Sequence, residues 1–250
     1  MLRPIPLGRG IYRKNNRLSF TNSHIEVMPI LEAKNIYKKY GELEVLRGIN
    51  LQIQKGEVVS IVGASGAGKS TLLHIIGTLD LPDDGSLTIQ NTPITKLNRN
   101  QLAEFRNKTI GFVFQFHNLL PEFTAFENVC LPAYIGGAEK AEAEKKANEL
   151  FDLLNISHRK NHKPSELSGG EQQRASVARA LMNNPSIIFA DEPSGNLDSK
   201  NADELHNLFF QLRDELQQTF VIVTHNNEFA DMADRKLEIS KGRVVGDLLV

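Results

Sequence analysis

One short stretch, residues 63–70, constrains this chain more than any other part of its sequence. It reads GASGAGKS and fits the pattern G-x-x-x-x-G-K-[ST]. A continuous apolar run, Val58–Val62, precedes it, and the pattern of residues 70–77 that follows is helical. Glycines let successive backbone N–H groups point inward around an anion, and a helix N-terminus adds the positive end of its dipole. The sequence therefore predicts a buried strand, a phosphate-binding loop and a helix, in that order.

The loop and the residue after it are the predicted contacts for the phosphates of ATP. Lys69 is expected to bridge the β- and γ-phosphates, and the Ser70 hydroxyl is expected to ligate Mg²⁺. A chance glycine-rich turn is the alternative, and the flanking strand and helix argue against it. The predicted nucleotide-binding residues here are Gly63, Ala64, Ser65, Gly66, Ala67, Gly68, Lys69, Ser70 and Thr71.

A second apolar run, residues 187–190, ends in the neighbouring carboxylates Asp191 and Glu192. A buried strand delivers both groups rigidly to one edge of a sheet. Asp191 is expected to hold the Mg²⁺ shell, as the second acidic element of a phosphate-loop site does. Glu192 is placed to polarise an attacking water as general base. The alternative interpretation is an ordinary solvated acid at the end of a strand. A position opposite a phosphate-binding loop argues against it.

A third motif, LSGGEQ at residues 167–172, predicts a second anion-binding helix start. Ser168 stands three residues before Glu171, which is the spacing of a capping box. Gly169 and Gly170 let the backbone approach an anion, and the helix start offers free N–H donors. A capped helix with no ligand is the alternative. One nucleotide needs only one phosphate-binding helix start per chain, so the second helix start must have a different explanation.

The LSGGEQ motif resembles the signature of ATP-binding cassette (ABC) ATPases. In that family the signature contacts the γ-phosphate of ATP bound to the opposite subunit. The resemblance therefore implies a homodimer in which Ser168, Gly169, Gly170 and Glu171 complete the partner's site.

Four further matches fall in the family's order. Tyr40 resembles the aromatic residue that stacks on adenine, and Gln115 the Q-loop glutamine that senses Mg²⁺ and faces a membrane partner. Residues 194–198 resemble the D-loop at the dimer interface, and His225 the switch histidine that touches the γ-phosphate. Taken singly, Tyr40 could be a core residue, and His225 a surface residue like His158 or His206. The resemblance covers about residues 30–250.

The resemblance implies an α/β fold: a P-loop NTPase cassette with a RecA-like core, an antiparallel β subdomain and an α-helical subdomain at about residues 116–180. All three would lie in one ATP-binding domain, residues 29–250. The patterns predict strands and helices at matching places. Strands are expected at 30–36, 46–53, 58–62, 87–89, 110–114, 187–190 and 220–223, helical segments at 125–154 and 201–216, and a closing hairpin at 236–248 turning around Lys241 and Gly242.

Residues 1–28 differ from the rest of the chain. They are rich in arginine and poor in acid, which is typical of some targeting segments, but they lack the apolar stretch of a secretory signal. Prolines and glycines interrupt any amphipathic helix there. We expect a disordered extension, or a start assigned ahead of a true start at Met28.

Net charge, cysteine content and apolar runs limit the partners and the cellular compartment that we expect for this chain. The net charge of −1 gives no reason to expect nucleic-acid binding. Cys130 is the single cysteine, so it can form neither an internal disulfide nor a cysteine-based zinc site, and a reducing cytosol is the simplest compartment. No apolar run approaches the roughly 20 residues that span a bilayer. If the chain works at a membrane, a partner must hold it there. The resemblance to ABC ATPases implies integral membrane subunits that hold the chain at the cytoplasmic face of the bacterial inner membrane, without contact between the chain and the transported substrate.

Residues 191–198 read DEPSGNLD, which resembles the ATPases of lipoprotein-releasing exporters and of related macrolide exporters and cell-division systems. Residues 72–80, 114–129 and 158–168 look closest to the lipoprotein-releasing type. The resemblance implies Mg-ATP hydrolysis that drives lipoproteins from the inner towards the outer membrane. A macrolide-type exporter, or a cell-division ATPase that acts as a mechanical switch, stays open. A DNA-repair ATPase is excluded, since it would need a long coiled-coil or zinc-bearing insert between the two phosphate motifs.

Overall fold

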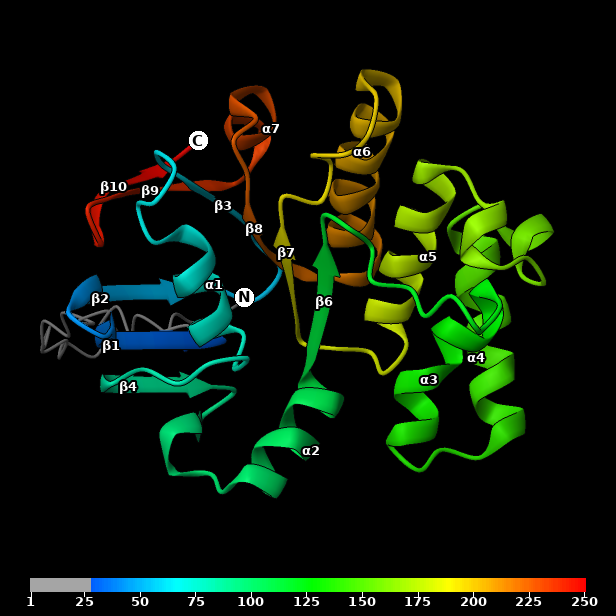
Figure 1. The fold of residues 1–250 in the computed structure, drawn as a ribbon, viewed down its shortest axis with the longest axis horizontal. Coiled ribbons are helices and arrows are strands. Elements are labelled where there is room, and N and C mark those ends of the chain that lie inside the picture. The colour runs from blue at the N-terminus through cyan, green and yellow to red at the C-terminus, as the bar shows by residue number, and fades with distance from the viewer. Residues whose placement is uncertain (1–27) are drawn as a thin grey trace, which may run out of the picture.

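The computed structural model describes residues 28–250. The expected disordered extension, residues 1–28, lies outside the described residues except for Met28. Figure 1 shows the order of the elements along the chain. The strands and helices are β1 (Leu31–Tyr40), β2 (Leu43–Ile53), β3 (Val58–Val62), α1 (Lys69–Ile76), β4 (Asp84–Ile89), β5 (Thr92–Pro93), α2 (Arg99–Thr109), β6 (Ile110–Phe114), α3 (Ala125–Ile135), α4 (Lys140–Leu153), α5 (Gly169–Leu181), β7 (Ile187–Asp191), α6 (Ser199–Leu216), β8 (Thr219–Val223), α7 (Asn227–Met232), β9 (Arg235–Ser240) and β10 (Arg243–Leu249).

A six-stranded sheet of order β10-β9-β3-β8-β7-β6 forms the centre of the molecule. Its strands are parallel except β10, which pairs antiparallel with β9 through the predicted hairpin. Both β3 and β8 are buried at every residue, because helices or the second sheet cover both faces. Alternate residues of β8 enter two separate cores: Phe220 and Ile222 face the core that contains α6, whereas Val221 and Val223 face α1.

A smaller antiparallel sheet, of order β2-β1-β4-β5, packs its apolar side into the same core as α1. The alternation expected in β2 is present, since Leu46, Ile49, Leu51 and Ile53 are buried between exposed or half-buried neighbours. In Figure 1 this sheet lies beside α1, with the green α2 below it. The expected antiparallel β layer is therefore observed.

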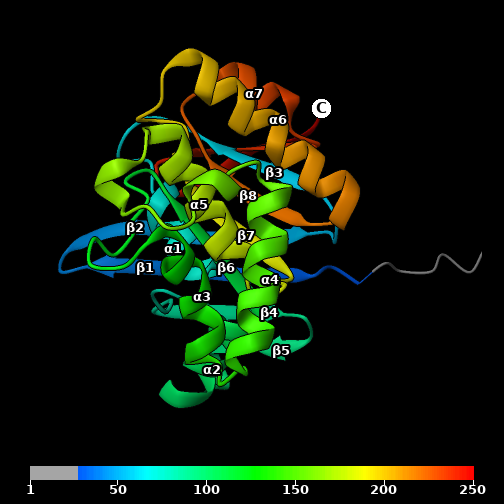
Figure 2. The same ribbon diagram turned by 90° about the vertical axis from the view of Figure 1, so that its right-hand side faces the viewer.

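Helices α3, α4 and α5 pack together on the other side of the molecule (Figure 2). The helical pattern expected over residues 125–154 is present as two helices, because α3 ends at Ile135 and α4 starts at Lys140. The break falls at Gly136 and Gly137, where Gly137 has φ 81° and so supplies the left-handed residue that commonly follows a helix.

Helix α2 was not among the expected elements. Asn98 caps it, accepting hydrogen bonds from the backbone N–H groups of Asn100 and Gln101. Only Leu102 and Thr109 of its eleven residues are buried, so its sequence carries little apolar periodicity. No helix within residues 28–250 is both long enough and apolar enough to cross a membrane.

Candidate functional site

The predicted phosphate loop connects β3 to α1 at the carboxyl edge of the central sheet. Gly63 and Gly68 have φ angles of 149° and 105°, which side-chain-bearing residues rarely adopt. A Cβ on Gly63 would lie 2.2 Å from the carbonyl oxygen of Ile239 in the neighbouring strand β9. The loop is thus wedged against the sheet, and its glycines are required by both torsion and space.

Lys69 and Ser70 open helix α1 directly after the loop. The Lys69 ammonium donates to the carbonyl oxygens of Gly63 and Ala64, at 2.8 and 3.1 Å, so it folds back over the loop. The Ser70 hydroxyl donates to the Asp191 carboxylate at 3.3 Å. Strand order explains this meeting of residues 121 positions apart, because β3 and β7 both flank β8 and end at the same edge.

Glu192 follows β7 and faces His225, which follows β8. The Glu192 backbone N–H donates to the Val223 carbonyl at 2.9 Å, and the residue adopts φ 48°, an uncommon angle for a side chain of its size. Its carboxylate Oε2 accepts from the His225 backbone N–H at 3.1 Å and lies 2.7 Å from His225 Nδ1. Two loops of the sheet edge are therefore joined through one carboxylate oxygen.

Most of these groups line one cleft of about 600 Å³, although Asp191 is not among its lining residues. Lys69 gives the cleft a cationic group and Glu192 an acidic one. The lining residues are Leu43, Val45, Gly63, Ser65, Gly66, Gly68, Lys69, Ser70, Thr71, Glu192, Val223 and His225. The structure thus gathers most of the predicted loop residues with Glu192 and His225.

The LSGGEQ motif lies elsewhere, since none of Ser168, Gly169, Gly170 and Glu171 lines this cleft. Figure 1 shows α5 on the other side of β6 from α1. The expected capping box is formed: the Ser168 hydroxyl accepts from the Glu171 backbone N–H, and the Glu171 carboxylate accepts from the Ser168 backbone N–H at 2.8 Å. Ser168 and Gly169 are exposed, so this helix start faces outward.

The Glu171 carboxylate is further held by Arg159 and His158. Arg159 Nε donates to it at 2.7 Å, and His158 Nε2 lies 3.4 Å away. Partial burial opposes its ionisation, but the hydrogen bonds from the Ser168 backbone and from Arg159 outweigh burial and lower the pKa of Glu171 to about 2. The start of α5 is therefore a rigid, charged structure within a single chain.

Residues 46–195 match the family model described as ABC transporter. The chain belongs to the ABC transporter family. Its curated relatives include the lipoprotein-releasing system ATP-binding proteins LolD of Cytophaga hutchinsonii, 59% identical over 86% of this chain and 99% of the relative, and of Porphyromonas gingivalis, 58% identical over 85% and 97%.

Two solved structures extend the comparison. The dimeric ATP-binding cassette MJ0796, described as a bacterial ABC transporter cassette, is 42% identical to the chain with a TM-score of 0.81, over 88% of this chain and 98% of that one. A post-hydrolysis dimer of the same cassette bound to ADP and Pi has a TM-score of 0.80 at 41% identity. The chain is accordingly an ATP-binding and ATP-hydrolysing subunit of an ABC transporter, with the ABC cassette fold, and cassettes of this family dimerise.

Gln115 of this ABC subunit lies next to the predicted D-loop. Its side-chain amide donates to Asn196 Oδ1 at 3.0 Å, and the Asn196 amide donates back to the Gln115 carbonyl at 3.1 Å. Sequence reasoning singled out the loop but gave Asn196 no role of its own. Nothing in a local pattern reports this pairing, because the two residues are 81 positions apart.

Tyr40 lies at the end of β1, half exposed and outside the lining of the cleft. Its hydroxyl donates to the Asp80 carboxylate at 2.9 Å, and burial together with this bond raises the pKa of Tyr40. The ammonium of the buried Lys38 lies 5.4 Å from the centre of its ring and 3.0 Å from Asp80. Tyr40 is therefore not a core residue. Asp80 holds its hydroxyl, and the Lys38 ammonium lies over its ring.

Two residues that line the cleft, and one beside Asp191, escaped sequence reasoning. Leu43 and Val45 of β2 line the cleft beside the loop, although their pattern indicates only strand. His74, one turn along α1 from Ser70, approaches Asp191 to 4.0 Å. Its spacing from Ser70 on a helix was the available signal, since residues four apart share a face.

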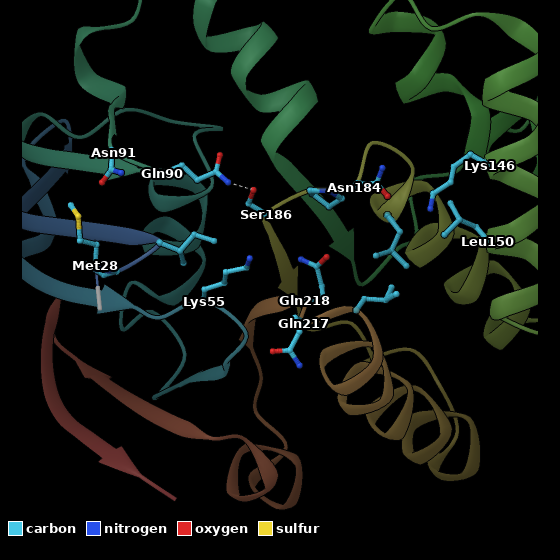
Figure 3. A pocket seen from close by; sticks show the side chains of 15 residues that line it. Met28, Lys55, Gln90, Asn91, Lys146, Leu150, Asn184, Ser186, Gln217 and Gln218 are labelled. Carbon is cyan, nitrogen blue, oxygen red and sulfur yellow. Dashed lines mark hydrogen bonds between the residues drawn. The ribbon is translucent and has the colours of Figure 1, made fainter. Parts of the chain in front are cut away.

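Another cavity, of about 730 Å³, lies at the amino edge of the sheet (Figure 3). Lys55, Lys146 and the amides of Gln217 and Gln218 line it, and the Gln90 amide donates to the Ser186 hydroxyl there. It is the larger of the two, but none of the predicted site residues lines it. The predicted phosphate-loop residues therefore line the smaller cleft and not this cavity.

Proposed function

We propose that this chain is the ATPase subunit of a lipoprotein-releasing ABC transporter, which moves lipoproteins from the inner membrane towards the outer membrane. The observation that carries the proposal is the extent of the similarity. Relatives with this function in their names are 54–59% identical to the chain and are matched over 97–100% of their length. The DEPSGNLD reading of residues 191–198 supports the same choice.

Different residues at the cleft would bind different parts of ATP. Residues 63–71 would hold the phosphates through their backbone N–H groups, with Lys69 neutralising charge on the β- and γ-phosphates. Tyr40, steadied by Asp80, would stack on the adenine from β1. Phosphoryl transfer depends mainly on such positioning and charge neutralisation.

The oxygen atoms around Ser70 fit a magnesium ion. The Ser70 hydroxyl and the Asp191 carboxylate lie 3.3 Å apart, and the Gln115 side chain would add an amide oxygen. Hydroxyl, carboxylate and amide oxygens are the hard ligands that Mg²⁺ prefers. The ion would neutralise phosphate charge there, which is its usual contribution to phosphoryl transfer.

Glu192 and His225 would act on the water and the γ-phosphate. Glu192 lines the same cleft as Lys69 and would accept a proton from the attacking water as general base. Its hydrogen bonds to the His225 backbone and ring fix the direction of the carboxylate. His225, 72% exposed on its side chain, would contact the γ-phosphate at the mouth of the cleft.

A homodimer would complete each site. The start of α5 does not line its own chain's cleft and faces outward, and its helix N-terminus is suited to bind an anion. Ser168, Gly169, Gly170 and Glu171 would then contact the γ-phosphate held by the opposite subunit. ATP would hold two such sites closed, and hydrolysis would release them.

Integral membrane subunits, similar to LolC and LolE, would read that opening at the helical subdomain, about residues 116–180. A groove of about 460 Å³ there is lined by residues that include Phe112, Phe114, Ile135 and Arg179. Phe116 and Ile135 are 74% and 76% exposed at or beside it, an unusual exposure for large apolar side chains. Such a contact would place the chain at the cytoplasmic face of the inner membrane, with no role for nucleic acid and no direct contact with the lipoprotein.

The proposal is tested by purifying the Glu192→Gln protein from native membranes in the presence of Mg-ATP and identifying what comes with it by mass spectrometry. Membrane subunits with a large periplasmic domain, together with bound lipoprotein, are the expected result. The matched control is Lys69→Ala, which should recover less of any partner that binds the ATP-bound dimer. A division-site partner or a macrolide-export partner in place of these subunits would reject lipoprotein release and leave the ATPase assignment intact.

A further inference from the structure

His206 is buried, contrary to its treatment as a surface residue in the sequence. It lies on α6 with 3% of its surface exposed, and its Nε2 is 2.9 Å from the hydroxyl of Ser194 in the predicted D-loop. On its other side the imidazole stacks on Phe229 of α7, with ring centroids 4.0 Å apart and planes 12° apart. One side chain therefore contacts both the loop after Glu192, at Ser194, and the helix after His225, at Phe229.

These contacts are part of a closed circuit of interactions that connects the loop after Glu192 with the helix after His225. Ser194 follows Glu192 by two residues, and Phe229 belongs to the helix that begins after His225. The Phe229 backbone N–H donates to the side chain of Asn226, which follows His225 directly. The circuit closes where the His225 backbone and ring meet the Glu192 carboxylate, at 3.1 and 2.7 Å.

Helix α7 is anchored independently of this circuit, so it can act as a fixed support. The Ser60 hydroxyl of the fully buried strand β3 donates to the Ala230 carbonyl at 3.2 Å. The ring of His206 is thus clamped between a helix tied to the sheet and a half-buried loop serine. Moving Ser194 away from His206 would leave a buried ring nitrogen without its partner, which is costly.

We propose that His206 is a positioning residue for ATP hydrolysis: it holds the loop after Glu192 at a set distance from the helix after His225, so that the two cleft residues keep their mutual geometry. This inference rests on the roles proposed above for Glu192 and His225. His206 does not line the cleft, so it acts through Ser194 and Phe229. The same restraint orients residues 194–198, the segment expected at the dimer interface.

The charge state of the imidazole suits this role. Burial lowers the pKa of His206, and the nearby Asp203 opposes that shift only in part. A neutral imidazole can accept or donate one hydrogen bond at Nε2 and can stack flat on an apolar ring. Leucine would fill the space without a hydrogen bond, whereas glutamine can keep one polar group near the position of Nε2.

The test compares His206→Leu, His206→Gln and Ser194→Ala in the complex recovered from native membranes, measuring kcat and the KM for ATP. His206→Leu should lower kcat about threefold to tenfold, the rate equivalent of one hydrogen bond, with KM within about twofold of wild type. His206→Gln should recover at least half of the loss. The double variant Ser194→Ala/His206→Leu should be no slower than His206→Leu alone, since both changes break the same contact.

Leu212→Ala is the matched control, because Leu212 is a fully buried residue of the same helix and lies towards the end of α6 away from Ser194. It should lower the Tm and leave kcat unchanged at 25 °C. Equal kcat values for His206→Leu and wild type, equal losses for the Leu and Gln variants, or a matching loss in Leu212→Ala would overturn the proposal. Lys69→Ala in the same assay tests the cleft separately: full activity there would reject the proposed site itself, whatever His206 does.

Discussion

Lys69 and Glu171 show how single residues of this chain combine a structural and a functional role. Lys69 closes its own loop through two backbone carbonyls, yet among the described residues it is the one lysine or arginine that lines the cleft. Glu171 caps a helix and binds Arg159, yet it stands at the start proposed to meet the partner's nucleotide. Substitutions at these positions need controls that separate the two roles.

Lys69→Ala should raise the Kd for ATP at least tenfold and abolish turnover, because the phosphates lose their nearest neutralising charge. Equilibrium binding of a fluorescent ATP analogue and phosphate release measure the two effects. Lys55→Ala, in the exposed turn before β3, is the matched control and should change neither. An unchanged Kd in Lys69→Ala would reject residues 63–71 as the phosphate site.

Glu171 predicts a pH dependence of folding. Its folded-state pKa, about 2, lies below the ordinary 4.5, so its stabilisation is complete above about pH 4.5 and is lost as the pH falls towards 2. Between pH 7 and pH 4 the free energy of unfolding should fall by about 0.5–1 kcal/mol more in the wild type than in Glu171→Gln. Urea unfolding of both proteins at the two pH values measures this. Parallel losses in the two proteins would contradict the charge-stabilised cap.

At the scale of elements, α2, α3 and α5 all begin with a capping box, and α2 and α5 differ in the role proposed for the helix start. Both α2 and α5 begin with a capping box, Asn98 with Gln101 and Ser168 with Glu171. The box of α5 was predictable, because its serine, glycines and glutamate stand in one short window. The box of α2 precedes a mostly polar helix, so the sequence carried the cap without the apolar periodicity that would have revealed the helix.

Ser168→Ala and Asn98→Ala should each cost about 1 kcal/mol of stability, since each removes the side-chain acceptor for the helix N-terminal N–H groups. Only Ser168→Ala should also lower ATP hydrolysis, because only α5 is proposed to reach a nucleotide. Thermal unfolding and phosphate release in parallel separate the two effects. If Asn98→Ala slowed hydrolysis to the same degree, the loss in Ser168→Ala would reflect stability alone.

At the scale of the whole molecule, the cleft and the start of α5 are each proposed to form half of an ATP site. The two halves in one chain belong to different ATP sites. Neither half can bind a γ-phosphate from both sides within one chain, because no residue of 168–171 lines the cleft. The dimeric solved cassettes of the same fold agree with an arrangement in which two chains meet. Dimerisation should therefore depend on the nucleotide as well as on protein concentration.

Glu192→Gln should form a stable dimer in Mg-ATP, because the amide keeps the shape of the carboxylate but cannot accept the proton from water. Its turnover should fall at least about 100-fold, the lower range of general-base catalysis. Size-exclusion chromatography with light scattering, with ATP, with ADP and after EDTA, measures the assembly. Adding Lys69→Ala should abolish the dimer. Hydrolysis at the wild-type rate in Glu192→Gln would reject Glu192 as the general base.

The sequence by itself determined the local parts of this protein. The glycine-rich turn, the Ser168 cap, the hairpin at Lys241 and Gly242 and the buried strands all follow from torsions, capping and periodicity within a few residues. Strands β3 and β6 have the bounds expected of them. The order of the motifs then indicated the family and the fold, as the comparisons bear out.

Only the tertiary structure decided which of these parts meet. The approach of Ser70 to Asp191 and the pairing of Glu192 with His225 depend on β3, β8 and β7 lying side by side in register. The burial of His206 against Phe229 depends on how α6 and α7 cross. Strand order and helix packing sum weak contacts between distant segments, and no window along the chain contains both members of such a contact.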